Sequence, residues 1–167
     1  GDYHLAIAGG VESMSRAPFI LSKSETAFGR KAEIYDTTIG WRFVNPAMKA
    51  AYGVDSMPET ADHVALDYHI SRADQDAFAL RSQQRWAAAY ATAKFADEIT
   101  PVMIPQRHGD PVAVDTDEHP RPDTKPEQLA ALKGVNGKGM SVTAGNASGV
   151  NDGAAALLLA SANGLAT

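Results

Sequence analysis

Residues 143–153 carry side chains of the types that commonly contact a bound ligand. The stretch, TAGNASGVNDG, combines small residues with two amide and two hydroxyl side chains. Small residues let a backbone approach a ligand closely, and amide and hydroxyl groups can fix the ligand's orientation. A long turn before a strand would have the same composition, so the residues themselves leave both interpretations open.

The histidines and clustered carboxylates of the chain do not form a recognisable metal site. His63 and His69 lie six residues apart in a predicted helix and therefore face different sides of it. His108 falls in a predicted turn and His119 in a loop, where a surface position is the simpler interpretation. Residues 115–118 hold three carboxylates but lack the spaced acidic loop and the glycine of a calcium site. We interpret them as solvated charges and expect no metal ligand here.

The complete absence of cysteine removes several kinds of chemistry from the chain. It excludes disulfides, cysteine-bound zinc and a thiol nucleophile. The sequence also has no Gly-rich phosphate loop followed by a lysine. Gly9 and Gly10 are interpreted as a tight turn.

Composition and charge describe an ordinary globular chain of 167 residues, 44% of them hydrophobic. The formal charge of −5 and the scattered Lys and Arg residues predict neither a nucleic-acid nor a membrane partner. The longest apolar run, residues 154–160, is too short to cross a bilayer. No signal peptide is recognisable, so a cytoplasmic location is expected. Both ends fall inside apparent structural elements, which predicts a truncated chain.

Two helices and several short strands are predicted to position these residues. A strand covers residues 5–8, residues 11–55 are irregular, and a capping box at Ser56 opens a helix with Pro58 in its first turn. Ser71 is expected to cap a second helix that runs to about Ala93. Its buried stripe is predicted to comprise Phe78, Ser82, Trp86, Ala89 and Ala93, with Asp76, Gln83 and Lys94 facing solvent.

The second half of the chain predicts a hairpin, a short helix and a final strand. The hairpin strands cover residues 98–104 and 112–115, and the helix covers residues 129–132. Residues 153–161 are predicted as a second buried strand, although their Ala and Leu content favours a helix. Glycines isolate the segment, and the sequence alone leaves both conformations open.

Several segments, in order, resemble the thiolase family over essentially the whole chain. They are residues 8–18 (AGGVESMSRAP), 57–61 (MPETA), 71–79 (SRADQDAFA), 97–99 (DEI) and 144–154 (AGNASGVNDGA). Residues 36–46 (DTTIGWRFVNP) resemble a narrower branch, the 3-oxoadipyl-CoA thiolases.

The resemblance implies an α/β fold that is part of a five-layered α/β/α/β/α enzyme. Residues 1–13 and 151–167 would form core strands of the N-terminal half, and residues 14–150 would form the inserted α+β loop domain. The implied reaction is acyl transfer between a 3-oxoacyl-CoA and CoA, with CoA as substrate and no other cofactor. Implied partners are CoA, acyl-CoA, the remaining thiolase halves and further subunits in a homodimer or homotetramer, often joined by the segment after Ser13.

The resemblance also assigns roles along CoA. Arg121 would reach the adenine and Gln128 would lie near the nucleotide. Met48, Met57 and Leu132 match apolar wall positions, while Ala144, Gly145 and Ser148 match positions that meet the pantetheine arm. Arg42 could contact an acyl carboxylate. The alternatives are a surface arginine, core methionines, a turn serine and, for Arg42, a structural pairing within its loop or at a subunit contact.

The chain departs from the family at Gly134-Val135-Asn136, where Pro and a Phe that walls the pantetheine tunnel are usual. The catalytic Cys and His residues of the family have no counterpart here, so we expect this chain alone to be inactive. The alternative is a non-catalytic module that binds acyl-CoA or another protein.

Overall fold

The computed structural model describes residues 3–166 and divides the chain into two compact units. Unit 1 comprises Gly1–Ser56 and Val150–Thr167, and unit 2 comprises Met57–Gly149. Unit 1 thus brings the two ends of the chain together, whereas unit 2 is one continuous stretch. The domain boundaries expected near residues 13 and 150 stay predictions.

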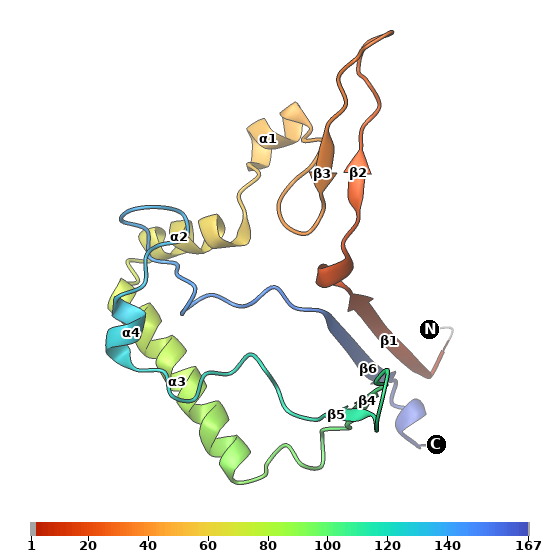
Figure 1. Ribbon diagram of the computed structural model, residues 1–167, viewed down its shortest axis with the longest axis vertical. Helices are drawn as coiled ribbons and strands as arrows, with labels where there is room; N and C mark the ends of the chain where they lie inside the picture. Colours follow the sequence, from red (N-terminus) through yellow and green to blue (C-terminus); the bar gives the residue numbers. More distant parts are fainter. Residues whose placement is uncertain (1–2, 167) are drawn as a thin grey trace. The chain divides into compact units, whose positions relative to one another are not determined.

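Unit 1 is built on one antiparallel pair of strands, β1 (Leu5–Glu12) and β6 (Gly153–Ala160) (Figure 1). Leu5 lies opposite Ala160 at one end of the pair, and Glu12 lies opposite Gly153 at the other. The strand predicted for residues 153–161 is confirmed although its Ala and Leu content favours a helix. Pairing with β1 decides its conformation, because strand preference depends mainly on neighbours in the sheet.

The predicted turn at Gly9-Gly10 is wrong, since both glycines continue β1. They lie opposite Ala156 and Ala155 in the ladder. A Cβ atom on Gly9 would come within 2.6 Å of the Ala155 carbonyl oxygen, whereas one on Gly10 would meet nothing within 4 Å. Gly9 therefore allows the backbones of β1 and β6 to approach closely, which is a common reason for a glycine inside a strand.

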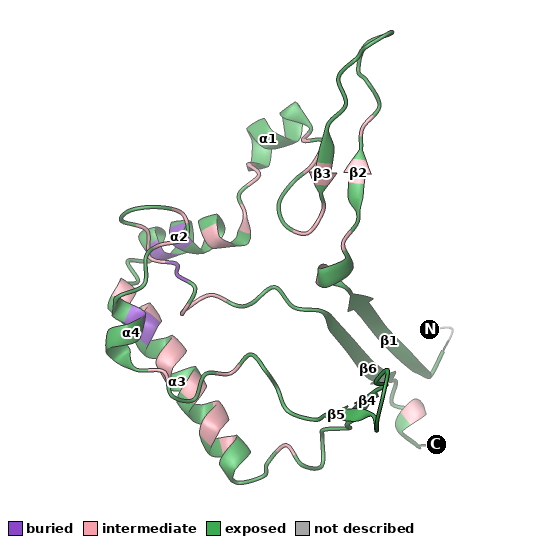
Figure 2. Cartoon of the chain, in the orientation of Figure 1, coloured by how far each residue is buried: buried purple, intermediate pink, exposed green. Residues whose placement is uncertain are grey.

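Both faces of the β1–β6 ladder are apolar. Leu157 and Leu158 point to opposite faces and are 66% and 68% exposed. Figure 2 shows the two strands exposed along their whole length. Strands with this composition on both faces are typical of the interior of an α/β sheet.

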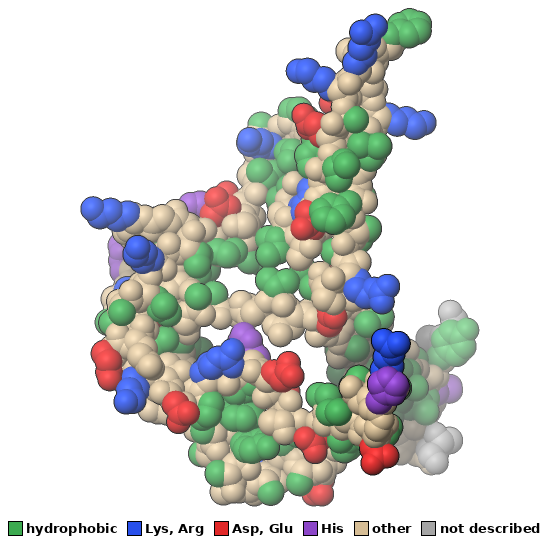
Figure 3. Space-filling view, viewed as in Figure 1, with side chains coloured by type: hydrophobic (Ala, Val, Ile, Leu, Met, Phe, Trp, Pro, Cys, Tyr) green, Lys and Arg blue, Asp and Glu red, His purple; other side chains and the backbone are tan. Residues whose placement is uncertain are grey.

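The segment predicted to be irregular contains more structure than expected. A 3₁₀ turn, a hairpin and a helix follow β1: Met14–Arg16, β2 (Phe19–Leu21), β3 (Ile34–Asp36) and α1 (Pro46–Tyr52). The Asn45 side chain accepts hydrogen bonds from the Ala47 and Met48 amides and thereby caps α1. Asn45-Pro46 is a helix start signal, but the helix is too short for its apolar periodicity to be recognised in the sequence. Lys and Arg side chains surround the far end of the hairpin (Figure 3).

Unit 2 contains three helices and a second hairpin. Its elements are α2 (Met57–Asp67), α3 (Arg72–Ala91), β4 (Val102–Ile104), β5 (Val112–Val114) and α4 (Pro126–Ala130). The predicted cap of α3 is confirmed, because the Ser71 hydroxyl accepts a hydrogen bond from the Asp74 amide. Among the described residues, no helix combines the length and apolar character needed to cross a membrane.

Two predicted elements of unit 2 are shifted in the structure. β4 starts at Val102 rather than residue 98, because the amides of Glu98 and Ile99 donate to the Phe95 carbonyl and are unavailable to a ladder. α4 starts at Pro126 rather than residue 129. A proline at the first helical position needs no hydrogen-bond partner, and this start signal lay upstream of the apolar residues that suggested the helix.

The predicted orientation of α3 is partly wrong. Asp76, expected in solvent, is 8% exposed, whereas Phe78, expected in the core, is 65% exposed. Gln83 is half-buried and accepts a hydrogen bond from the Arg121 amide. The side of α3 that is covered meets polar loops with hydrogen-bond donors, so polar pairing decides which face is buried.

Asp62 of α2 is the most heavily hydrogen-bonded carboxylate of unit 2 and is only 1% exposed. One oxygen accepts from the Ser141 amide at 2.8 Å, the Ser141 hydroxyl at 2.9 Å and the Val142 amide at 3.0 Å. The other accepts from Asn136 Nδ2 at 2.7 Å. A helix is thereby joined to a loop about 80 residues further along the chain.

Asp76 holds the other side of the same loop. It pairs with Arg72 at 2.8 Å, and Arg72 also donates to the carbonyls of Leu129 and Leu132 around the end of α4. Asp76 Oδ1 accepts from Asn146 Nδ2 at 3.0 Å. The two aspartates therefore bind residues 141–146 at both ends, Asp62 at Ser141 and Val142 and Asp76 at Asn146.

Hydrogen bonding controls the ionisation of Asp62. Burial raises its pKa, but the donors of Asn136, Val142 and Ser141 outweigh burial and leave the pKa below its ordinary value. A carboxyl group with a lowered pKa in the folded state contributes stability above its unfolded pKa. That contribution is lost as the pH falls through the folded pKa.

We predict that Asp62→Asn lowers the free energy of unfolding at pH 7 and makes it less sensitive to acid. The difference from the parent should shrink as the pH falls below about 4, because Asp62 then binds a proton in the unfolded chain, while in the folded protein it does so only at a lower pH. Urea denaturation at a series of pH values measures this. Asp67→Asn, an exposed change on the same helix, is the control, and an unchanged acid dependence in Asp62→Asn would contradict the assignment.

The two strand glycines should respond differently to substitution. Gly9→Ala forces a Cβ against the backbone of β6 and should destabilise the protein by about 1–3 kcal/mol, the range for overpacking. Gly10→Ala meets open space and should be neutral or slightly stabilising. Urea midpoints of the two variants give the comparison, and equal effects would refute the close-approach argument.

Candidate functional site

Arg121, the residue expected to meet adenine, is exposed and held in place by its own loop. Its Nη1 donates to the carbonyls of Glu118, His119 and Pro120 at 2.8, 3.1 and 3.1 Å, and its amide donates to Gln83 at 2.7 Å. Hydrogen bonds of this kind lie in the guanidinium plane. The flat faces of the group therefore remain suited to stacking on a planar partner.

The loop expected to meet the pantetheine arm packs against α4. A Cβ atom on Gly145 would lie 2.5 Å from Leu129 Cδ2 and 2.6 Å from Leu132 Cδ1, so the absence of a side chain permits this packing. The structure therefore brings together Gly145 and Leu132, two of the residues expected to meet CoA. Ala144 and Ser148 are exposed in the same loop.

The loop is fixed internally as well as at its ends. The Thr143 amide donates to Asn146 Oδ1 at 2.7 Å, and the Gly145 amide donates to Thr143 Oγ1 at 3.2 Å. Asn146 also donates to the Ser141 carbonyl. Thr143 itself is fully buried. The amides and hydroxyls that suggested ligand contact from the sequence thus partly serve the loop's own geometry.

Gln128 and Met57 lie at helix starts. Gln128 Oε1 accepts a hydrogen bond from the Lys125 amide and so caps α4. Met57 opens α2 and is 75% exposed, which leaves its apolar surface available to a ligand or to another part of a larger protein.

The departure at Gly134-Val135-Asn136 has a local structural reason. A Cβ atom on Gly134 would lie 2.7 Å from the carbonyl oxygens of both Gly137 and Met140, so the turn has no room for a larger residue. The Val135 amide donates to the Val142 carbonyl, and Asn136 donates to Asp62. The departing residues therefore tie this turn to Val142 and to Asp62, next to the loop that is expected to meet the pantetheine arm.

In unit 1, Arg42 is turned back on its own loop. Its Nε donates to the Asp36 carbonyl and its Nη1 to the Gly40 carbonyl. The next residue, Phe43, has a φ of 51° and meets the Tyr35 ring edge-on at 5.3 Å. These contacts support the structural alternative for Arg42. Met48 lies in α1 and is 39% exposed.

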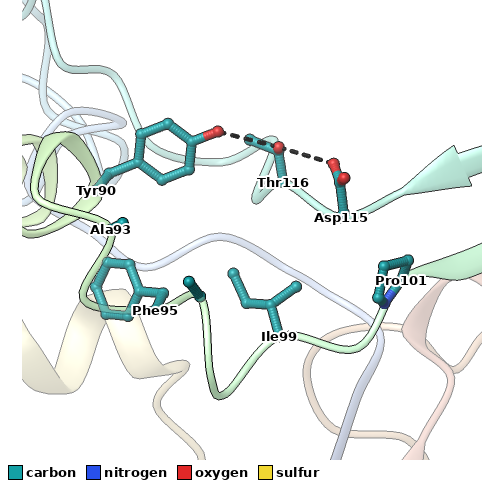
Figure 4. Close-up of a pocket in the computed structure, with 8 residues that line it drawn as sticks. Tyr90, Ala93, Phe95, Ile99, Pro101, Asp115 and Thr116 are labelled. Atoms are coloured by element: carbon teal, nitrogen blue, oxygen red, sulfur yellow. Dashed lines mark hydrogen bonds between the residues drawn. The ribbon is translucent and has the colours of Figure 1, made fainter.

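A cavity of about 440 Å³ opens in unit 2. It is lined by Tyr90, Ala93, Phe95, Ala96, Ile99, Pro101, Asp115 and Thr116. Figure 4 shows the Tyr90 hydroxyl and Asp115 both bonded to the Thr116 hydroxyl. None of the residues assigned to CoA lines this cavity, so it does not contribute to the candidate site.

Sequence reasoning missed the two aspartates that hold the site. Asp62 was not singled out and Asp76 was predicted to face solvent, because a charged residue in an amphipathic helix is usually solvated. A weak signal existed, since aspartate is unfavourable inside a helix unless its side chain has a particular partner.

Comparison with known proteins supports the resemblance along the chain. The model of the thiolase N-terminal domain matches residues 1–163. A β-ketoadipyl-CoA thiolase from Pseudomonas aeruginosa is 67% identical over 97% of this chain. The 3-oxoadipyl-CoA/3-oxo-5,6-dehydrosuberyl-CoA thiolase of Escherichia coli K12 is 58% identical over 96% of it. The chain spans 40% of the length of each of these relatives.

The fold agrees with that of a solved thiolase. The crystal structure of human mitochondrial 3-ketoacyl-CoA thiolase in complex with CoA superimposes on 98% of this chain with a TM-score of 0.77 and 36% sequence identity. The match covers 39% of the human chain. The expected fold class is therefore confirmed: this chain belongs to the thiolase family and forms part of the thiolase fold within the N-terminal domain.

Proposed function

We propose that this chain forms the CoA-binding part of a thiolase that transfers acyl groups between a 3-oxoacyl-CoA and CoA. The observation that carries the proposal is the arrangement of unit 2. Arg121 presents a fixed planar cation, and residues 144–148 form a narrow loop held by two buried aspartates. A flat cation suits adenine, and a loop without large side chains suits a thin pantetheine arm.

The chain's residues bind and orient but do not react. Thiolysis requires a nucleophile that accepts the acyl group while the bond between the α and β carbons breaks. The α carbon keeps the electron pair, takes a proton and leaves as a shorter CoA thioester, and the acyl group then passes to the sulfur of CoA. A thiolate is suited to this step, and no cysteine is present. The nucleophile and its proton-transfer partners would belong to other parts of a complete thiolase, and we expect the isolated chain to be inactive.

A dicarboxylic acyl chain is the proposed substrate class. The relatives at 58–67% identity are named for 3-oxoadipyl (β-ketoadipyl) substrates, whose acyl group ends in a carboxylate. The competing proposal, a non-catalytic acyl-CoA-binding or interaction module, predicts binding without turnover. The other thiolase parts and further subunits are proposed partners.

The function can be tested in a chimera of the Pseudomonas aeruginosa relative that carries this chain in place of its matching segment. We expect CoA-dependent cleavage of 3-oxoadipyl-CoA by the chimera and none by the chain alone. CoA binding without cleavage in the chimera would favour the non-catalytic module.

Arg121→Ala in the chimera should raise the KM for CoA roughly tenfold, through the loss of a cation–π contact and some packing. The kcat at saturating CoA should change little, because the residue lies far from any reacting atom in this proposal. Arg107→Ala, an exposed arginine in the β4–β5 turn, serves as control. A large fall in kcat with an unchanged KM would reassign Arg121.

Arg42→Met tests carboxylate recognition through the Nη2 group of its guanidinium. Loss of a hydrogen bond to a charged group should weaken cleavage of 3-oxoadipyl-CoA by about 1.5–3 kcal/mol and spare acetoacetyl-CoA. Both substrates are compared by kcat/KM. Equal losses would assign Arg42 to the loop structure, as its bonds to the Asp36 and Gly40 carbonyls suggest.

A further inference from the structure

Asp62 accepts hydrogen bonds from Ser141 and from Val142, which lies two residues before the proposed ligand loop at residues 144–148. Its carboxylate receives the amides of Ser141 and Val142, and Ala144 follows directly after buried Thr143. Between these positions the chain has little freedom, because Val142 and Thr143 are 5% and 0% exposed. A shift of the Asp62 carboxylate would therefore be passed to Ala144 and Gly145.

Asn136 fixes the direction of this carboxylate. Its Nδ2 donates to one oxygen at 2.7 Å while the loop amides occupy the other. Asn136 lies in the segment where the chain departs from its family, and there the side chain contributes a hydrogen bond instead of an apolar wall. Steric crowding at Gly134 keeps this turn in place.

We propose that Asp62 and Asn136 act together as positioning residues for the pantetheine arm of CoA, an inference that rests on the proposed CoA-binding function. Neither side chain needs to touch CoA. Their hydrogen bonds set where the backbone of residues 144–148 lies, and binding of a narrow ligand arm is sensitive to small displacements of its support.

The pairing can be tested by exchanging its two partners in the chimera. Asn136→Asp places a second carboxylate against Asp62, and repulsion should displace the loop. The double variant Asp62→Asn/Asn136→Asp restores a donor and an acceptor. The amide at position 62 can still accept from Ser141 and Val142 while its nitrogen donates to the carboxylate at position 136.

We expect Asn136→Asp to raise the KM and the calorimetric Kd for CoA roughly tenfold, within the usual coupling of neighbouring residues. The kcat should stay within about threefold, since the reacting groups are untouched. The double variant should return both constants to within about threefold of the parent. Asp67→Asn, on the surface of the same helix, should change neither constant.

A merely structural role gives a different pattern. Loss of folded enzyme lowers the apparent kcat and leaves the KM for CoA unchanged, and that result would overturn the proposal. An Asn136→Asp variant that binds CoA as tightly as the parent would overturn it as well. If Asn136→Asp does not fold, Asn136→Ala replaces it. This variant removes one hydrogen bond without repulsion and should raise the KM about two- to threefold. A parent chimera that neither binds nor cleaves would instead remove the proposed function itself.

Discussion

The conformation of unit 2 depends on two buried carboxylates whose hydrogen bonds are made by distant parts of the chain. Asp62 and Asp76 stand on successive helices, and both bind the loop at residues 141–146. Among the described residues, the buried apolar side chains are only Ala65, Leu129 and Val142. Apolar packing of that extent leaves many arrangements of similar energy. Buried charged side chains are compatible with very few arrangements, because each buried donor or acceptor left without a partner costs about 1–3 kcal/mol.

This polar arrangement suits a binding surface better than a larger apolar core would. The loop has no room for a side chain at Gly145, where a Cβ atom would meet Leu129 and Leu132. Its stability then has to come from the backbone. The amides of Ser141, Val142 and Thr143 all donate to side-chain oxygens, which holds the loop while leaving Ala144 and Ser148 exposed.

Unit 1 follows a different physical rule. Its two long strands are apolar on both faces and exposed, a composition typical of strands that other layers cover in an α/β sheet. Family membership explains this composition, since the matched relatives are more than twice as long as this chain. Acyl transfer and ligand binding are thus separated along the sequence in our proposal. In that proposal the residues here would position CoA, and the reactive thiol would lie elsewhere.

The sequence by itself determined the family and the long helices, because ordered motifs and the Ser71 cap are local signals, whereas pairing with β1 decided the final strand. The CoA assignments for Arg121 and residues 144–148 also came from the sequence, and they remain predictions. Only the tertiary structure decided that Gly9 lies inside a strand and that Asp76 faces inward, with Phe78 outside. The physical reason is the same in each case. A close backbone approach or a buried hydrogen bond depends on a partner far along the chain. The periodicity of apolar residues depends only on residues close together in the sequence and does not reveal that partner.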